Sequence, residues 1–108
     1  MAIVGLGYVG LPLAYEFSKH YNVIGYDIDK SLIDSLNNNI DSKEYYTQKE
    51  LKNCNVKFSK NSLDLVGVDI FIITVPTPVT KNKKPNLTPL INSTKLISKF
   101  IKKKFNYL

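Results

Sequence analysis

The sequence contains no arginine, no tryptophan, one cysteine (Cys54) and one histidine (His20). A single cysteine excludes an intramolecular disulfide and argues against a cysteine-based metal cluster. Cys54 lies in the polar stretch 52–55 without a histidine close in sequence, so the activating surroundings of a reactive thiol are missing. His20 falls where a first helix is expected to end, which is typical of a capping role. We expect no metal site.

Long apolar runs are also absent, since no run approaches the roughly 20 residues that span a bilayer. The chain opens directly into an apolar stretch without a basic-then-apolar signal segment. We therefore expect a cytoplasmic protein with no membrane partner. A length of 108 residues, 44% of them hydrophobic, predicts one domain over residues 1–108.

Acidic residues are missing from the carboxyl-terminal segment 79–108. The formal net charge of +6 divides into −2 over residues 1–78 and +8 over residues 79–108, which hold eight lysines and no acid. Because all fifteen basic residues are lysine and bidentate base recognition relies on arginine, the composition argues against nucleic-acid binding. A solvated loop followed by lysines at a helix carboxyl end accounts for this charge; a basic patch for an anionic partner is the alternative.

A glycine-rich segment, Gly5-Leu-Gly-Tyr-Val-Gly10, follows the apolar stretch 2–4 and precedes a helical pattern. A second apolar run, 23–27, then ends in Asp27. This order of strand, glycine turn, helix and acid-terminated strand predicts the first βαβ unit of a dinucleotide-binding sheet. The alternative is a glycine-rich turn without a ligand.

Each glycine has a physical role in this interpretation. Gly5 permits the tight turn, Gly7 lets the backbone approach a pyrophosphate, and Gly10 lets the helix pack on the sheet. The free N–H groups at the helix start would hold the phosphates. We therefore expect Gly5, Gly7, Tyr8, Val9 and Gly10 to bind the cofactor.

Asp27 is the second predicted component of the cofactor site. At the carboxyl end of its strand, the carboxylate would accept hydrogen bonds from the adenosine ribose. Because a carboxylate repels a 2′-phosphate, the prediction is NAD rather than NADP.

The remaining pattern predicts an α/β fold, the first half of a doubly wound Rossmann sheet with strand order 3-2-1-4. Strands are expected at 2–4, 23–27, 56–58 and 68–75, the last buried on both faces. Helices are expected at 10–20, after Asp29 as N-cap, after the capping box at Thr47, at 62–66, and after Thr88 as N-cap with Pro89 first in the helix. Their predicted packing faces are Ala14, Phe17 and Tyr21; Leu32, Ile33, Leu36 and Ile40; and Leu90, Thr94, Ile97 and Ile101.

The loop after the fourth strand begins Pro76-Thr-Pro78. Ligands of open α/β sheets bind where strand order reverses, here between the first and fourth strands. The loop should therefore meet the glycine segment, with Pro76 stiffening it and Thr77 offering a hydroxyl and an amide to a cofactor. The alternative is a rigid turn that only ends the strand.

These segments resemble the cofactor-binding amino-terminal domain of the UDP-glucose/GDP-mannose dehydrogenase family. The resemblance rests on Gly5-Leu-Gly-Tyr-Val-Gly-Leu-Pro-Leu-Ala14, Gly25-Tyr-Asp-Ile-Asp29, Asp69-Ile-Phe-Ile-Ile-Thr-Val-Pro-Thr-Pro78 and Lys84-Pro-Asn-Leu-Thr-Pro-Leu90. It extends to about Lys103 and is similar above all to bacterial UDP-N-acetylhexosamine 6-dehydrogenases that serve surface polysaccharides. It implies that Pro76 and Thr77 lie near the nicotinamide-side ribose.

The resemblance also implies an activity, the two-step oxidation of a sugar C6 alcohol to a carboxylate with two NAD molecules. The second step uses a cysteine in Phe-Gly-Gly-x-Cys-x-x-Lys-Asp, a motif that does not occur here. We therefore expect a truncated chain that is inactive alone, with a UDP-sugar as partner only in the full-length enzyme. A homo-oligomer or a separate carboxyl-terminal half is also possible as a partner.

Two positions depart from the family pattern. Leu32 stands where relatives often place arginine or lysine, with Lys30 two residues earlier as a candidate replacement, and Asn86 stands where relatives usually have aspartate. We expect these departures to affect affinity more than fold. Two other interpretations remain: a non-catalytic remnant or regulatory NAD-binding module that docks on a partner chain, and a methyltransferase, which the Pro-Thr-Pro loop disfavours.

Overall fold

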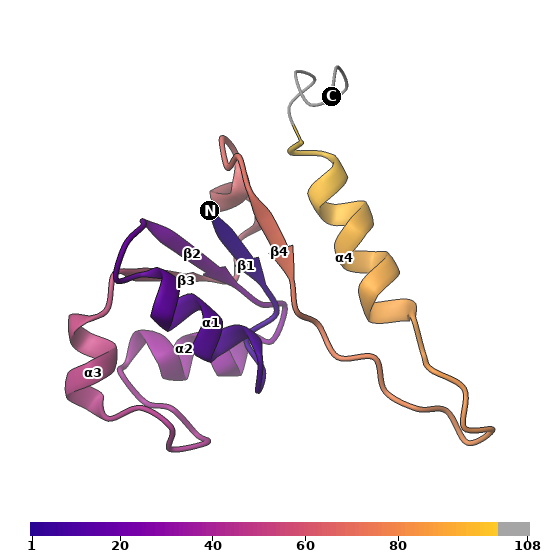
Figure 1. The fold of residues 1–108 in the computed structure, drawn as a ribbon, viewed down its shortest axis with the longest axis horizontal. Coiled ribbons are helices and arrows are strands. Elements are labelled where there is room, and N and C mark those ends of the chain that lie inside the picture. The colour runs from indigo at the N-terminus through magenta and orange to yellow at the C-terminus, as the bar shows by residue number, and fades with distance from the viewer. Residues whose placement is uncertain (102–108) are drawn as a thin grey trace.

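The structure is a computed structural model that describes residues 1–101. Four parallel strands form one sheet in the order β3-β2-β1-β4, so the predicted order is confirmed (Figure 1). The strands are β1 (Ala2–Val4), β2 (Val23–Tyr26), β3 (Val56–Ser59) and β4 (Phe71–Ile73). The helices are α1 (Gly10–Phe17), α2 (Lys30–Asn37), α3 (Gln48–Asn53), the 3₁₀ helix η1 (Ser62–Leu65) and α4 (Thr88–Ser98).

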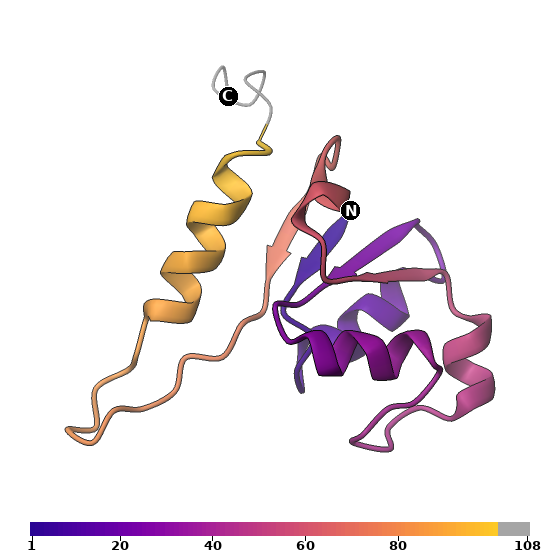
Figure 2. The ribbon, with the colours of Figure 1, turned by 180° about the vertical axis from the view of Figure 1, so that it is seen from behind.

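The sheet separates two hydrophobic clusters because successive strand side chains point to opposite faces. In β1, Ile3 packs into the cluster beneath α1, α2 and α3, whereas Ala2 and Val4 pack toward η1 and α4. All three are at most 2% exposed, as expected for a central strand covered on both faces. The helix α4 runs beside β4, away from the three other α-helices (Figures 1 and 2).

Local capping signals place two helix starts where the sequence predicts them. The Asp29 carboxylate accepts the Leu32 N–H at 3.1 Å and begins α2. Thr47 and Glu50 form the predicted capping box at α3, with bonds of 3.2 and 3.0 Å. Both signals satisfy backbone N–H groups that a helix cannot satisfy itself, so they act without help from the rest of the fold.

The first helix is shorter than predicted. It ends at Phe17, and Ser18 follows as C-cap with its hydroxyl bonded to the Tyr15 carbonyl at 2.6 Å. The chain then turns toward β2, which carries Tyr21 off the helix and leaves it 56% exposed. The prediction that Tyr21 faces the sheet was therefore wrong, whereas Ala14 is fully buried as predicted.

The fourth strand is also shorter and less buried than predicted. Only Phe71–Ile73 form strand, although the apolar pattern covers 68–75. In the four-stranded sheet β4 is an edge strand, so its residues are half-buried and Ile70 is 54% exposed. A continuous apolar run predicts burial on both faces but says nothing about how many strands flank it.

The start of α4 differs from the prediction in its cap. Leu87 is the N-cap and provides no side-chain hydrogen bond, so Thr88 is not the capping residue. The Asn86 side chain instead accepts the Thr88 N–H at 3.0 Å. Pro89 lies in the first helical turn, where its missing N–H costs nothing.

The packing face of α4 is rotated from the predicted one. Ile97 is buried, but Leu90, Thr94 and Ile101 are exposed. The residues that accompany Ile97 against the sheet are Leu96 and Phe100.

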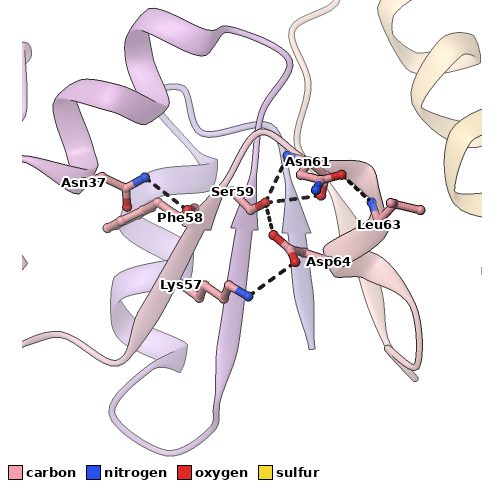
Figure 3. Close-up of polar contacts among 7 residues, drawn as sticks. All are labelled: Asn37, Lys57, Phe58, Ser59, Asn61, Leu63 and Asp64. Carbon is pink, nitrogen blue, oxygen red and sulfur yellow. Dashed lines mark hydrogen bonds and ion pairs between the residues drawn. The ribbon is translucent and has the colours of Figure 1, made fainter.

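A polar network joins β3 to η1 and α2 (Figure 3). The Ser59 hydroxyl donates to the Asp64 carboxylate at 2.5 Å, and the Lys57 ammonium lies 3.3 Å from the same carboxylate. The bond from Ser59, together with Lys57, lowers the pKa of Asp64. On the other side of the strand, the Asn37 amide donates to the Phe58 carbonyl at 3.3 Å. These contacts fix the carboxyl end of β3.

Two isoleucines from the predicted stripe of α2 provide a test of the fold. Ile33 is fully buried, whereas Ile40 lies beyond the helix and is 57% exposed. We predict that Ile33→Ala lowers the free energy of unfolding by about 2–4 kcal/mol because it leaves a core cavity. Ile40→Ala should change it by no more than about 0.5 kcal/mol. Urea unfolding measures both, and equal losses would contradict the placement of these side chains.

Candidate functional site

The turn from β1 into α1 brings backbone against backbone. Gly5 has a φ of 101°, and a Cβ there would lie 2.9 Å from the Thr74 carbonyl carbon. A Cβ on Gly10 would lie 1.7 Å from the Gly5 carbonyl oxygen. Any side chain at either position therefore clashes with main chain. At Gly7, by contrast, a Cβ would meet no atom within 4 Å, so that side of the loop is open.

Neighbouring strands fasten this turn on both sides. On the β2 side, the Leu6 N–H donates to the Asp27 carboxylate at 2.8 Å. On the β4 side, the Thr74 hydroxyl donates to the Gly5 carbonyl at 2.7 Å. Sequence reasoning missed Thr74, whose one signal is a hydroxyl inside the apolar run 70–75.

The open side of the loop presents unpaired donors. Within residues 1–101, the backbone N–H groups of Gly7, Tyr8 and Val9 donate to no other residue. Val9 is the N-cap of α1 and supplies no side-chain hydrogen bond. These N–H groups and the positive end of the helix dipole together suit an anion such as a phosphate.

A cleft of about 510 Å³ lies between this loop, the end of β2 and α4. Four of the predicted site residues line it: Gly5, Gly7, Asp27 and Pro76. The volume lies within the range of cofactor pockets, and apolar residues make up most of the wall. The structure therefore brings the glycine loop, the acidic strand end and the loop after β4 together, as the strand order predicts.

The other predicted site residues do not line the cleft. Tyr8 and Val9 are 72% and 66% exposed, and Thr77 is also exposed. Gly10 is buried under the turn. The side chains of Tyr8, Val9 and Thr77 thus lie outside the cleft, so any cofactor contact from the first two falls to their backbone N–H groups.

The carboxylate of Asp27 is held in place by backbone groups. Besides the bond from Leu6, its second oxygen accepts the Asp29 N–H at 2.9 Å. Each oxygen keeps a further lone pair that can accept a hydroxyl hydrogen. Asp27 is thus both a fastening for the loop and a fixed acceptor at the cleft.

Sequence reasoning did not predict the contribution of α4. Asn92, Ser93 and Leu96 line the cleft together with Ile28 and Leu32 of the α2 side. The rotated packing face of the helix brings them there. At Leu32, where the family pattern has a cation, the wall of the cleft is thus apolar.

The second departure from the family pattern, Asn86, also lines the cleft. Its side-chain oxygen accepts the Thr88 N–H, and its own N–H donates to the Pro78 carbonyl at 2.6 Å. Asparagine and aspartate both form this kind of turn, so the substitution preserves the start of α4.

Comparison with known proteins identifies the family. Residues 1–106 match the profile described as "UDP-glucose/GDP-mannose dehydrogenase family, NAD binding domain". The chain belongs to this family. The matched region is the family's NAD-binding domain, and the cleft, open glycine loop and fixed carboxylate fit that cofactor.

Individual members of the dehydrogenase family are similar over nearly the whole chain. Protein CapL of Staphylococcus aureus is 46% identical over 94% of this chain, and a UDP-N-acetyl-D-glucosamine 6-dehydrogenase of Pseudomonas aeruginosa is 46% identical over 95%. The structure of a UDP-D-ManNAc dehydrogenase from Pyrococcus horikoshii aligns with a TM-score of 0.84 at 32% identity and confirms the Rossmann-type fold, covering 94% of this chain and 26% of that one. The chain spans about a quarter of the length of the two curated relatives.

Within residues 1–101, no helix is both long and apolar enough to cross a membrane. The same residues contain no group of three His, Cys, Asp or Glu side chains that could hold a metal ion. Cys54 is half-buried and its thiol donates to the Leu51 carbonyl at 3.1 Å, a local contact at the end of α3.

The two glycines of the turn yield a paired prediction. Gly10→Ala should lower the free energy of unfolding by about 3 kcal/mol or more, since the new methyl overlaps the Gly5 carbonyl. Gly7→Ala should change it by no more than about 0.5 kcal/mol because its surroundings are open. Thermal or urea unfolding of the two variants measures the difference. A Gly7 variant as unstable as the Gly10 variant would contradict the open loop.

Proposed function

We propose that this chain binds NAD across the cleft, with the pyrophosphate on the open side of the glycine loop. The observation that supports this most is the combination of unpaired N–H groups at Gly7, Tyr8 and Val9 with the fixed Asp27 carboxylate beside them. Gly5 and Gly10 shape the turn, and Gly5 also lines the cleft. Bound NAD supplies a hydride acceptor at its nicotinamide ring.

The cleft offers a distinct environment to each part of the dinucleotide. Its apolar wall of Ile28, Leu32 and Leu96 suits the adenine ring, and Asp27 suits the hydroxyls of the adenosine ribose. Pro76 lines the cleft on the β4 side, where the nicotinamide half would lie. Thr77 follows it and would contribute through its backbone near the second ribose.

Charge at the ribose end supports a preference for NAD. A 2′-phosphate would bring its negative charge against Asp27, and Asp29 also lines this part of the cleft. Because none of the cleft-lining residues among 1–101 is a lysine, no cation in the cleft offsets that repulsion.

We predict that the chain binds NAD at least about 10-fold more tightly than NADP, the effect of about 1.4 kcal/mol of repulsion. Asp27→Asn should remove most of this preference, while its amide oxygen still accepts the Leu6 N–H and preserves the turn. Titration followed by the rise in melting temperature measures both. Equal stabilisation by the two nucleotides in the wild type would overturn the role of Asp27.

The activity of the full-length protein is also a proposal. We infer that the domain serves a UDP-N-acetylhexosamine 6-dehydrogenase, since the relative from Pseudomonas aeruginosa carries that activity in its name at 46% identity. A UDP-sugar would then bind to the part of the relatives that this chain does not span. A single domain over residues 1–108, cytoplasmic location and homo-oligomer formation stay predictions. A regulatory NAD-binding module that docks on another chain is the alternative and shares the same cleft.

The chain alone should not oxidise a sugar nucleotide, because the family's cysteine motif does not occur in its sequence. Incubation of the purified chain with NAD and UDP-N-acetylglucosamine should produce no NADH by absorbance above the background without sugar. NADH formation that depends on the UDP-sugar would contradict the assignment of this chain to cofactor binding alone. Activity gained only on addition of a second chain would favour a split enzyme.

A further inference from the structure

The pyrophosphate of NAD carries two negative charges, and no full positive charge among residues 1–101 lines the cleft to match them. The chain has no arginine, and the cleft-lining residues among 1–101 include two aspartates and no lysine. The loop N–H groups carry only partial charges. A full cation that adds to these N–H groups would come from outside the cleft wall.

Lys43 is such a cation. Its ammonium lies 4.7 Å from the centre of the Tyr8 ring, and Tyr8 directly follows Gly7 in the glycine loop. The Tyr45 ring meets the Tyr8 ring edge-on at 6.3 Å. Within residues 1–101, the Lys43 ammonium forms no salt bridge with a carboxylate. An aromatic face attracts an ammonium without neutralising it, so the charge stays available to an anion.

Hydrogen bonds to Asp41 hold the segment 41–46, which carries Lys43, in one conformation. Asp41 is 7% exposed, and its carboxylate accepts the N–H groups of Lys43, Tyr45 and Tyr46 at 3.0, 2.9 and 3.1 Å. The Tyr46 ring stacks on Tyr15 of α1 at 4.3 Å. The segment therefore contacts the glycine loop at Tyr8 and the helix α1 at Tyr15.

The topology explains why Lys43 can reach the loop. The connection between α2 and α3 extends to the same end of the sheet as the turn from β1 into α1 (Figures 1 and 2). Asp41 uses its oxygens on backbone groups of its own segment, and within residues 1–101 it forms no salt bridge with Lys43.

We propose that Lys43 is a positioning residue for the cofactor's pyrophosphate, held over Tyr8 until the phosphates arrive. This inference rests on the proposed function. The flexible four-carbon stem lets the ammonium move from the ring to a phosphate oxygen, and lysine binds phosphate as a point charge. The Tyr8 side chain, which lies outside the cleft, thereby gains a role that neither the glycine motif nor the cleft explains.

The test compares ligands with and without the pyrophosphate. ADP-ribose carries it, whereas adenosine ends before it, and amide-shift titration by NMR gives a dissociation constant for each. Lys43→Gln should weaken ADP-ribose binding about 3- to 10-fold and leave adenosine binding unchanged. Lys43→Arg should restore most of the affinity, and the loss in Lys43→Gln should shrink at high salt because added ions screen the charge.

Matched lysine variants complete the design. Lys49→Gln removes an equal charge from an exposed position on α3 and should leave both affinities unchanged. Lys30→Gln tests the rival cation at the start of α2.

Loss of ADP-ribose binding in the Lys30 variant but not in the Lys43 variant would overturn the inference, as would equal weakening of ADP-ribose and adenosine by Lys43→Gln. Unaltered ADP-ribose binding by Lys43→Gln would overturn it while leaving the proposed function intact. A wild-type chain that binds neither ligand would refute both.

Discussion

Main chain packs directly on main chain where β1 turns into α1, and the nucleotide end of the sheet depends on that contact. The Gly5 carbonyl lies where a side chain on Gly10 would be, and the end of β4 closes on Gly5 from the other side. This packing brings α1 down onto the central strand and turns the donors of residues 7–9 outward. A bulkier residue at either glycine would lift the helix and displace the free N–H groups of residues 7–9 together with the packing.

Residues around the turn both hold the fold together and line the cleft. Asp27 accepts the Leu6 N–H of the loop and also lines the cleft, so one carboxylate has a structural role and the binding role that we propose. Asn86 begins α4 and lines the cleft as well. The site is therefore made largely of groups that the fold already needs, which explains why its open parts are backbone N–H groups rather than side chains.

The sequence predicts best what local chemistry decides. The caps at Asp29 and Thr47 act through neighbours within a few residues, and the structure has them where the pattern places them. The glycine turn is recognised by its local spacing, although Gly5 packs against the distant Thr74. The strand order follows from the motif because the βαβ unit fixes which strands are neighbours.

The predictions fail where contacts between distant parts of the chain determine which residues are buried and how long an element is. The apolar residues of α4 allow two stripes that share Ile97, and only contact with the sheet selects the stripe with Leu96 and Phe100. The length and exposure of β4 depend on its place at the sheet edge. Thr74 and Lys43 contact a turn that lies far from them in sequence. The hydroxyl of Thr74 inside an apolar run is a weak local signal, and Lys43 has none.

The bond from Thr74 to Gly5 joins residues 69 positions apart, whereas the bond from Leu6 to Asp27 spans 21. Closing the longer loop costs more chain entropy, so during folding the β2 side of the turn is expected to form before the β4 side. On a ribosome, β1, α1 and β2 emerge well before β4. The glycine turn is then held on both sides only after β4 has joined the sheet. A nucleotide that binds the complete turn would favour the docking of β4 by mass action.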